Sequence, residues 1–192
     1  MTYTLKDVFY LGAVHQYTAT NYSAANKSGN IPIDVSAYVD PIAKGRQRGQ
    51  GLAVYKVHSF VAGDAEGGAQ INTDAGQITY GLTVKPYTSS GDDSSMLEAG
   101  DLTPESDLLI YGAEYTAPAT RVPGSGYTNK EEYLTPSKEV PYVCVRDTIF
   151  QLFLANIGLS SSDDMFVSYR MECAMITLDT ATLNQLLRTQ TA

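Results

Sequence analysis

The stretch VPYVCVRDTIFQLFLANIGLSSSDDMFVSYRMECAMITL, residues Val140–Leu178, holds the densest apolar sequence in the chain. It contains two long apolar runs, Thr148–Ile157 and Met165–Leu178, separated by the polar turn cluster Ser160–Asp164. The first run has almost no polar side, which suits a strand covered on both faces or a short buried helix. Its aromatic and β-branched residues favour the strand.

The second run, Met165–Leu178, alternates between two sets of side chains. One set is apolar, and the other has a charged middle at Arg170 and Glu172. This period of two predicts a long strand with two different faces. Because the turn between the two runs is short, we expect them to pair antiparallel as a hairpin.

Three shorter segments also fit strands, at Leu52–Val61, Gln77–Lys85 and Asp107–Thr116. A fourth, Ile31–Val39, alternates cleanly with its odd-numbered residues inward. Its Pro32 cannot donate a ladder hydrogen bond, which predicts an edge position. The remaining segments are predicted to be irregular: the basic, glycine-rich turn Lys44–Gly51 and the long loops Gly63–Gly76, Tyr87–Ser106 and Ala117–Ser137.

Secondary structure is ambiguous near the N-terminus and clear near the C-terminus. Near the N-terminus, Leu5, Val8, Phe9 and Leu11 fit either a short helix or an edge strand. At the other end, Thr180–Arg188 is predicted to be a helix. Asp179 is a suitable N-cap, and Leu178 and Leu183 fit a hydrophobic staple.

Strands without alternating helices exclude a parallel α/β sheet. The pattern predicts an all-β fold: a two-sheet antiparallel β-sandwich of jelly-roll type, with long loops and a short C-terminal helix. An immunoglobulin-like sandwich is the second choice. We expect residues 1–30 to form an N-terminal segment that could serve as an arm between subunits. Residues 31–178 would form the sandwich, and residues 179–192 the C-terminal helix and tail.

The composition narrows the classes of function. The 192 residues are 43% hydrophobic and carry a formal net charge of −8, which argues against coating nucleic acid through overall charge. No apolar run approaches the length that spans a bilayer, and the N-terminus does not resemble a signal peptide. Cys144 and Cys173 are therefore predicted to be free, buried thiols, with a disulfide as the alternative.

No catalytic, cofactor-binding or metal-ligating motif stands out, so we predict no site residue of these kinds and no enzyme. His58 lies in a predicted strand, which suits a hydrogen-bonded histidine in the core or an interface. His15 has no metal-ligand spacing around it. Scattered acids could still serve a glycosidase, but sequence gives no way to pair them.

Charge is unevenly distributed along the chain. Gly91–Glu114 holds seven acids and no base, which could bind Ca²⁺, meet a basic neighbour or be a solvated loop. A basic cluster at Lys44, Arg46, Arg48 and Lys56 could complement it in head-to-tail subunit contacts or be ordinary surface charge. Asn21 and Asn26 begin glycosylation sequons, which are discounted without a signal peptide.

In architecture the chain resembles a single jelly-roll major capsid protein of an icosahedral virus. The resemblance rests on length, the β-rich run Ile31–Leu178, the tyrosine-rich loops and the closing strand Phe166–Leu178. Small coat proteins of this family that package their genome usually carry a basic N-terminal arm, whereas Met1–Asn30 holds only Lys6 and Lys27. The resemblance therefore implies a shell whose genome is packaged separately or that surrounds an internal membrane.

This resemblance implies a structural role in the virion: a subunit made in the host cytoplasm that self-assembles through its loops and termini. Its partners would be copies of itself and other capsid or vertex proteins, without strong direct binding of nucleic acid. Tyr-rich surfaces suit such contacts. A carbohydrate-binding spike or fibre module is the alternative, using loop tyrosines at Tyr17, Tyr22, Tyr87 and Tyr127. A filament subunit joined by strand exchange of the N-terminal segment is a third hypothesis.

Overall fold

Nine strands and a C-terminal helix form the part of the chain that the computed structural model describes, residues 8–17, 27–41, 48–63, 76–86, 103–117, 129–156 and 165–191. The strands are β1 (Phe9–Tyr17), β2 (Lys27–Asp34), β3 (Arg48–Gly63), β4 (Gly76–Thr83), β5 (Leu109–Ala117), β6 (Asn129–Leu134), β7 (Tyr142–Cys144), β8 (Thr148–Asn156) and β9 (Met165–Asp179). A 3-10 turn η1 (Ser36–Tyr38) follows β2, and the helix α2 (Thr180–Thr191) follows β9. None of the described helices is long and apolar enough to cross a membrane.

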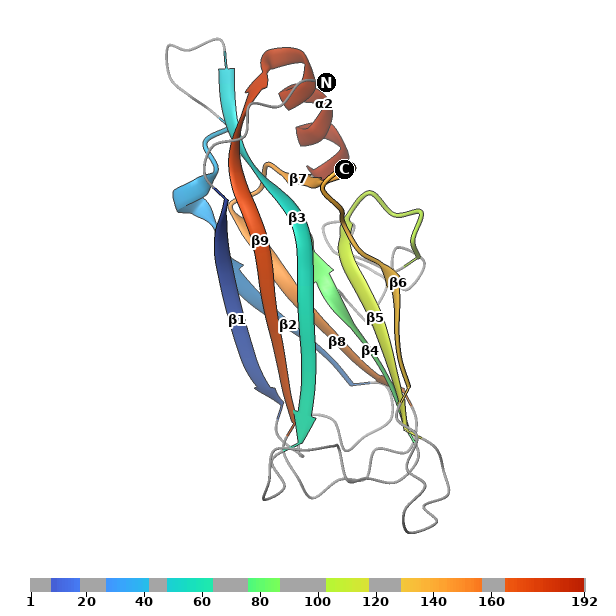
Figure 1. Ribbon diagram of the computed structural model, residues 1–192. Helices are drawn as coiled ribbons and strands as arrows, with labels where there is room; N and C mark the ends of the chain where they lie inside the picture. Colours follow the sequence, from blue (N-terminus) through green and yellow to red (C-terminus); the bar gives the residue numbers. More distant parts are fainter. Residues whose placement is uncertain are drawn as a thin grey trace.

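The strands form two antiparallel sheets, a four-stranded sheet ordered β1-β9-β3-β7 and a five-stranded sheet ordered β2-β8-β4-β5-β6. Figure 1 shows the four-stranded sheet in front of the five-stranded one. The pairing is nested: β1 pairs with β9, β2 with β8, β3 with β7 and β4 with β5. This wrapped arrangement of strands is a jelly roll, so the predicted fold class is confirmed.

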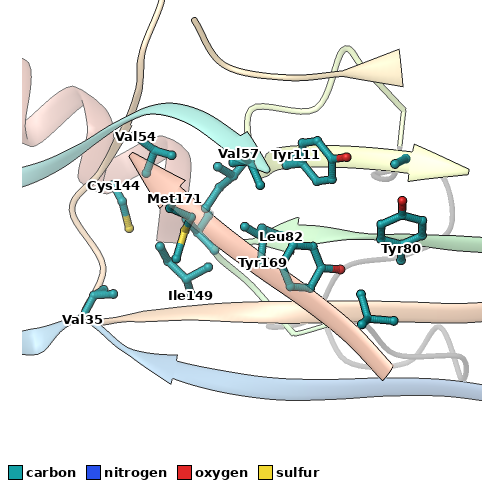
Figure 2. Close-up of a cluster of buried hydrophobic side chains, with 14 of the residues drawn as sticks. Val35, Val54, Val57, Tyr80, Leu82, Tyr111, Cys144, Ile149, Tyr169 and Met171 are labelled. Carbon is teal, nitrogen blue, oxygen red and sulfur yellow. The ribbon is translucent and has the colours of Figure 1, made fainter. Parts of the chain in front are cut away.

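The core lies between the two sheets (Figure 2). Alternate residues of each strand point into it, as the period of two requires. From β9 these are Val167, Tyr169, Met171 and Cys173, which form the apolar set expected from the sequence. From the facing sheet, Tyr80, Tyr111 and Phe153 are among the largest fully buried side chains.

The predicted hairpin of the two apolar runs is wrong. The first run forms β8, which pairs with β2 and β4, whereas the second forms β9, which pairs with β1 and β3 in the other sheet. Each run buries one face in the same core, so both can be apolar although they do not pair with each other. Residues 157–164, which join them, lie outside the described residues.

Several predicted boundaries also change. Phe9–Tyr17 is an edge strand of the sandwich, whereas residues 1–30 were expected to lie outside it. The strand expected at Ile31–Val39 ends at Asp34, because the backbone leaves the extended conformation at Val35 (φ −119°, ψ 13°) and enters the 3-10 turn η1. Ala37, expected to point inward, is exposed. Within the expected loop Ala117–Ser137, residues Asn129–Leu134 form the polar edge strand β6.

A β-bulge at Tyr55 divides β3 into two registers. Before the bulge, Leu52 and Val54 point into the core, and after it Val57 does so. The even-numbered residues therefore change face, and His58 points to solvent rather than into the core. The prediction of a hydrogen-bonded histidine holds through its contact with Glu172, but the core location is wrong.

The helix α2 covers one half of the outer face of the four-stranded sheet (Figure 1). Leu183 and Leu178 pack there in a second cluster of buried residues, together with Ala53, Tyr55, Val143, Val145, Ala174 and Ile176. The close approach of the helix depends on Gly49, because a Cβ at that position would overlap Leu183 at 2.5 Å. Arg48–Gly51, predicted as part of a turn, are instead the first residues of β3.

The start of α2 follows the sequence prediction. The Thr182 amide donates to the carboxylate of Asp179 at 2.8 Å, which makes Asp179 the N-cap. At its other end the buried Gln190 side chain accepts from the Val145 amide at 3.0 Å and donates to the Val143 carbonyl at 2.7 Å. The end of the helix thus provides hydrogen-bond partners for Val143 in β7 and for Val145 just after it.

Candidate interaction surface

The other half of the same outer sheet face has no cover among the described residues. Here β9 lies between β1 and β3, and their outward residues form cross-strand rows. Val14, Ser168 and Phe60 form one row, followed by Gly12, Arg170 and His58, and then by Tyr10, Glu172 and Lys56. We call these nine residues the open face.

The open face exposes three large apolar side chains. Val14 is 69% exposed, Phe60 61% and Tyr10 55%, and Val8 precedes them on the same side of β1. Single exposed apolar residues are normal, whereas apolar residues gathered on one face mark a surface that contacts another molecule.

A hollow of ≈ 450 Å³ opens in the middle of the open face. Its lining includes Tyr10, Gly12, Val14, Phe60, Ser168 and Arg170. Gly12 supplies the space, since it places no side chain between the larger residues around it. The nearest atom to a Cβ built there is the Tyr169 carbonyl oxygen at 3.8 Å, so a side chain would fit without a clash.

Two contacts hold the charged side chains of the open face in place. The guanidinium of Arg170 lies over the ring of Tyr10, 4.1 Å from its centroid, in a cation–π contact. The Nε2 atom of His58 is 3.1 Å from Oε1 of Glu172. The hydrogen bond to His58 is the main cause that lowers the pKa of Glu172, so this carboxylate is held in its charged form.

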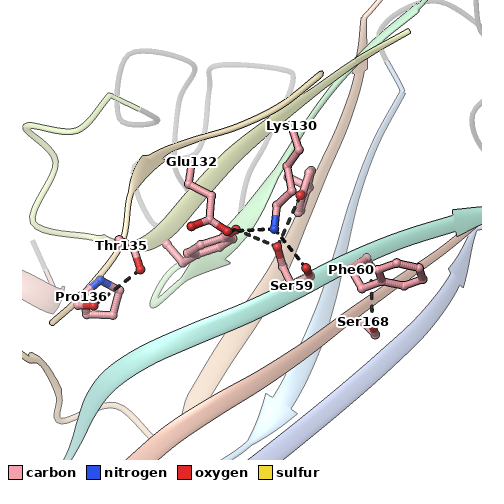
Figure 3. Close-up of polar contacts among 9 residues, drawn as sticks. Ser59, Phe60, Lys130, Glu132, Thr135, Pro136 and Ser168 are labelled. Atoms are coloured by element: carbon pink, nitrogen blue, oxygen red, sulfur yellow. Dashed lines mark hydrogen bonds and ion pairs between the residues drawn. The ribbon is translucent and has the colours of Figure 1, made fainter. Parts of the chain in front are cut away.

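A polar network closes the seam between the two sheets beside the open face (Figure 3). Ser59 Oγ lies 2.7 Å from the Tyr111 hydroxyl, which donates to Glu132 at 2.8 Å. Lys130 contacts Glu132 at 2.8 Å and donates to the Ser59 carbonyl at 3.0 Å. Burial raises the pKa of Tyr111, which therefore stays protonated and acts as a donor. Each group has a structural partner, so the network links β3 to β5 and β6.

The two cysteines are free and buried, as predicted. They lie on the strands that flank β3, opposite Leu52 and Val54. Burial raises the pKa of each thiol to about 12, which leaves them as unreactive apolar groups.

Other residues singled out in the sequence do not form a site in the described residues. His15 is half-buried on β1, and desolvation lowers its pKa. Arg48 and Lys56 lie at separate points of β3, where their cross-strand neighbours are Asp179 and Glu172, so they do not cluster. Among the described ranges, no group of three or more acids, histidines or cysteines could hold a metal ion.

Several predictions fall outside the described residues. They concern Lys44 and Arg46 of the basic cluster, residues 91–102 of the acidic segment and both sequons. They also include Tyr22, Tyr87 and Tyr127 of the carbohydrate hypothesis and the side chain of Tyr17. The acids Glu105, Asp107 and Glu114 are described, but they gather no metal-binding group there.

The open face itself was missed in the sequence. The sequence of β1 does contain a pattern that indicates this face: outward Tyr10 and Val14 alternate with inward Phe9 and Leu11, so both sides of the strand are apolar. Apolar residues on both faces of an edge strand indicate an apolar surface on the outside of the sandwich.

Comparison with known proteins gives likeness of fold alone. No family model matches the chain, and no curated protein matches it by sequence. Among solved structures, VP1 of Merkel cell polyomavirus in complex with disialyllactose aligns over 94% of this chain and 99% of its own, with 8% identity and a TM-score of 0.45. Human polyomavirus 12 VP1 in complex with 3'-sialyllactosamine aligns over 91% and 100%, with 8% identity and a TM-score of 0.47. A Bauhinia forficata lectin in complex with GalNAc covers 92% and 95%, at 9% identity and a TM-score of 0.20. At these values the comparisons assign neither a family nor a function.

Proposed function

We propose that this protein is a non-catalytic structural subunit of a viral capsid, which associates with further copies of itself into an icosahedral shell. The observation that carries the proposal is the open face, where Tyr10, Val14 and Phe60 are each more than half exposed on one sheet surface. Such a surface gains stability when another protein removes it from water.

The fold supports this proposal because double-sheet jelly rolls serve as building blocks of viral capsids. The open face has the composition of an interface, with aromatic residues and an arginine at its centre. Under the proposal the protein resides in the virion, where its partners are copies of itself and other capsid or vertex proteins. An internal membrane is a further candidate neighbour. The net charge of −8 makes strong direct binding of the genome unfavourable.

The test is the mass and shape of the purified full chain over a range of concentration and salt. Light scattering after size exclusion gives the mass, and negative-stain microscopy gives the shape. Closed shells support the proposal. A 20.7 kDa monomer at every concentration and salt, with or without Ca²⁺, contradicts it.

A carbohydrate-binding module is the second candidate, and the hollow is the observation that favours it. Tyr10 and Phe60 provide aromatic walls there, and Arg170 provides hydrogen-bond donors. This function predicts glycan binding by the monomer that is lost in Tyr10→Ala and Phe60→Ala. Glycan binding without assembly would replace the capsid proposal.

A further inference from the structure

The strand β1 forms one edge of the four-stranded sheet, and no strand lies on its outer side among the described residues (Figure 1). It is 9 residues long and contains no proline, lysine, arginine, aspartate or glutamate. Proteins commonly protect a long edge strand with such residues, because its outer backbone groups can pair with a strand of another chain. The strand β1 lacks this protection.

The other three edge strands of the two sheets are each protected. The strand β2 contains Pro32, which cannot donate a ladder hydrogen bond. The strand β7 has only 3 residues, and the side chain of Gln190 donates to its Val143 carbonyl at 2.7 Å. The strand β6 carries three consecutive exposed charges, at Lys130, Glu131 and Glu132. Of these four edges, β1 is therefore the one suited to receive another strand.

Hydrogen bonds elsewhere in the sheet show which backbone groups of β9 point toward β1. Successive residues of an antiparallel strand direct their N–H and C=O groups to alternate sides. In β3, Gln50 exchanges two hydrogen bonds with Asp40, on the side away from β9. Its partner Thr177 therefore bonds on its own far side, toward β1. The bulge at Tyr55 adds a residue to β3 and leaves the alternation of β9 unchanged, so the odd-numbered residues of β9 bond toward β1.

The outer backbone groups of β1 follow from this alternation. The odd-numbered residues of β9 pair with odd-numbered residues of β1, whose N–H and C=O groups point into the sheet. Tyr10, Gly12 and Val14 therefore direct their N–H and C=O groups out of the edge. Their side-chain positions lie on the open face, and all three residues are exposed. An added strand could bond to these groups and extend the open face at once.

The outward positions are self-complementary about Gly12. When a second copy of β1 runs in the opposite direction, Gly12 lies opposite Gly12 of the partner subunit, and Tyr10 of each copy lies opposite Val14 of the other. An aromatic residue opposite a β-branched one stabilises a pair of strands, and glycine leaves the axis free of side chains. We propose that two copies of this chain join edge to edge through β1, antiparallel about a two-fold axis at Gly12, so that their four-stranded sheets become one continuous sheet.

The charged residues of the sheet do not oppose this pairing. Arg170 and Glu172 lie on β9, one strand behind the edge. With about 4.8 Å between strands, three spacings or roughly 14 Å separate Arg170 from its copy in the partner. This exceeds the screening length of about 8 Å at physiological salt. Lys56 lies one strand farther away on β3, and Lys138 precedes β7, which forms the opposite edge.

The pairing specifies one interface of the proposed shell and rests on that function for its biological role, although the dimer can be tested alone. The first test uses proline. Gly12→Pro removes an N–H that points out of the edge, so the fold tolerates it. Sedimentation velocity of the full chain should show a dimer weakened about tenfold or more, because both hydrogen bonds at the axis are lost. A dimer of undiminished affinity would overturn the inference.

Ala13→Pro is the matched control for the fold. It removes an N–H that points toward β9, so it should lower the melting temperature measured by circular dichroism. Gly12→Pro should melt close to the original protein. If Gly12→Pro destabilised the fold as much as Ala13→Pro, the outward direction of the Gly12 backbone would be wrong, and the inference with it.

The second test places cysteines to read the register. Gly12→Cys sets two thiols opposite each other, with about 5.5 Å between the Cα atoms, which a disulfide can span. The nearest atom to a Cβ at Gly12 is 3.8 Å away, so the monomer accepts the side chain. Val14→Cys is the matched control on the same strand and face, because its two copies are offset by four residues, about 13 Å.

Oxidised glutathione should therefore convert Gly12→Cys into a covalent dimer and leave Val14→Cys unlinked. Cys144 and Cys173 do not interfere, since both are buried and burial raises the pKa of each thiol to about 12. Linkage through Val14→Cys without linkage through Gly12→Cys would overturn the register.

The outcomes separate this inference from the capsid proposal. Shells that form normally in Gly12→Pro contradict the pairing and keep the function. Dimers that depend on Gly12 but never grow into shells keep the pairing and contradict the function. A monomer at every concentration, with the Gly12 amide protected from hydrogen exchange, contradicts both and assigns the edge to a segment of the same chain.

Discussion

The two halves of the outer face of the four-stranded sheet share the same strands but differ in their cover. On one half, α2 buries Leu178, Ala174 and Ile176, each exposed by 2% or less. On the other half, Val14 and Phe60 remain more than 60% exposed. Both halves carry apolar outward residues, so strand patterning alone does not distinguish an internal contact from an external one.

The difference shows what each half contributes. The covered half stabilises the monomer, because its apolar area leaves water when the chain folds. The open face contributes little to the fold and leaves water only when another molecule arrives. Substitutions on the two halves should therefore separate stability from association.

The largest effect is expected for Leu183→Ala on the covered half. Leu183 is 7% exposed, so truncation leaves a cavity between α2 and β3. We expect the free energy of unfolding to fall by about 3 kcal/mol, measured by urea denaturation. Phe60→Ala, measured on the monomer, is the comparison and should change it by less than about 0.5 kcal/mol. An equal loss of unfolding free energy in both variants would show that the two halves contribute equally to the stability of the monomer.

A smaller loss is expected for Gln190→Ala. The substitution removes the partners of the Val145 amide and the Val143 carbonyl, which are buried beneath the helix. An unsatisfied buried group costs about 1–3 kcal/mol, so the unfolding midpoint should fall. Gln185→Ala, at an exposed position of the same helix, provides the control with little change. A similar midpoint for the two variants would show that the helix end is held by packing alone.

Acid should weaken the N-terminal end of α2 on the covered half. Backbone hydrogen bonding to Thr182 lowers the pKa of the capping carboxylate Asp179. A lowered pKa in the folded state stabilises the protein above the ordinary value of an aspartate, and this stabilisation is lost as the pH falls through the folded value. Helical circular dichroism should therefore decrease on acid titration. Asp179→Asn keeps the cap and should remove this part of the pH dependence, whereas an unchanged titration would assign it to other acids.

The smallest effect on stability is expected for Val14→Thr. Val14 is 69% exposed, so a hydroxyl there stays in water, and β-branching is kept. Stability should change by less than about 0.5 kcal/mol while self-association weakens. Val57→Thr, buried on the inner face of β3, is the matched control and should lower the thermal midpoint clearly. A large loss in Val14→Thr would mean that the open face supports the monomer.

The period of two predicted most of the fold. It identified the faces of β9, while the residue types of Pro32 and Asp179 predicted an edge position and a helix cap. Each of these predictions depends on residues close in sequence. The pairing of β8 and β9 could not be predicted in this way. Both runs are apolar, and which sheet each one joins depends on the nested partners β2 and β1 at the other end of the chain.

The open face was less predictable. The bulge at Tyr55 reverses the outward set of β3, and no residue type in LAVYKVHSFV marks it. By strict alternation, His58 and Phe60 would share the inner face of Val54. The exposure of Val14 depends on where α2 ends, which is a property of packing rather than of the local pattern.

The nested strand pairing also sets the order in which this chain can fold. The hairpin of β4 and β5 joins segments near the middle of the sequence, whereas β1 pairs with β9 near the opposite end. Closing so long a loop is slow, and contacts of this kind lengthen folding times. During synthesis, β1 emerges early and must wait for β9, with both apolar faces of the strand without their final partner. Completion of the sandwich therefore waits for β9, whose arrival also brings α2 to its place and completes the open face.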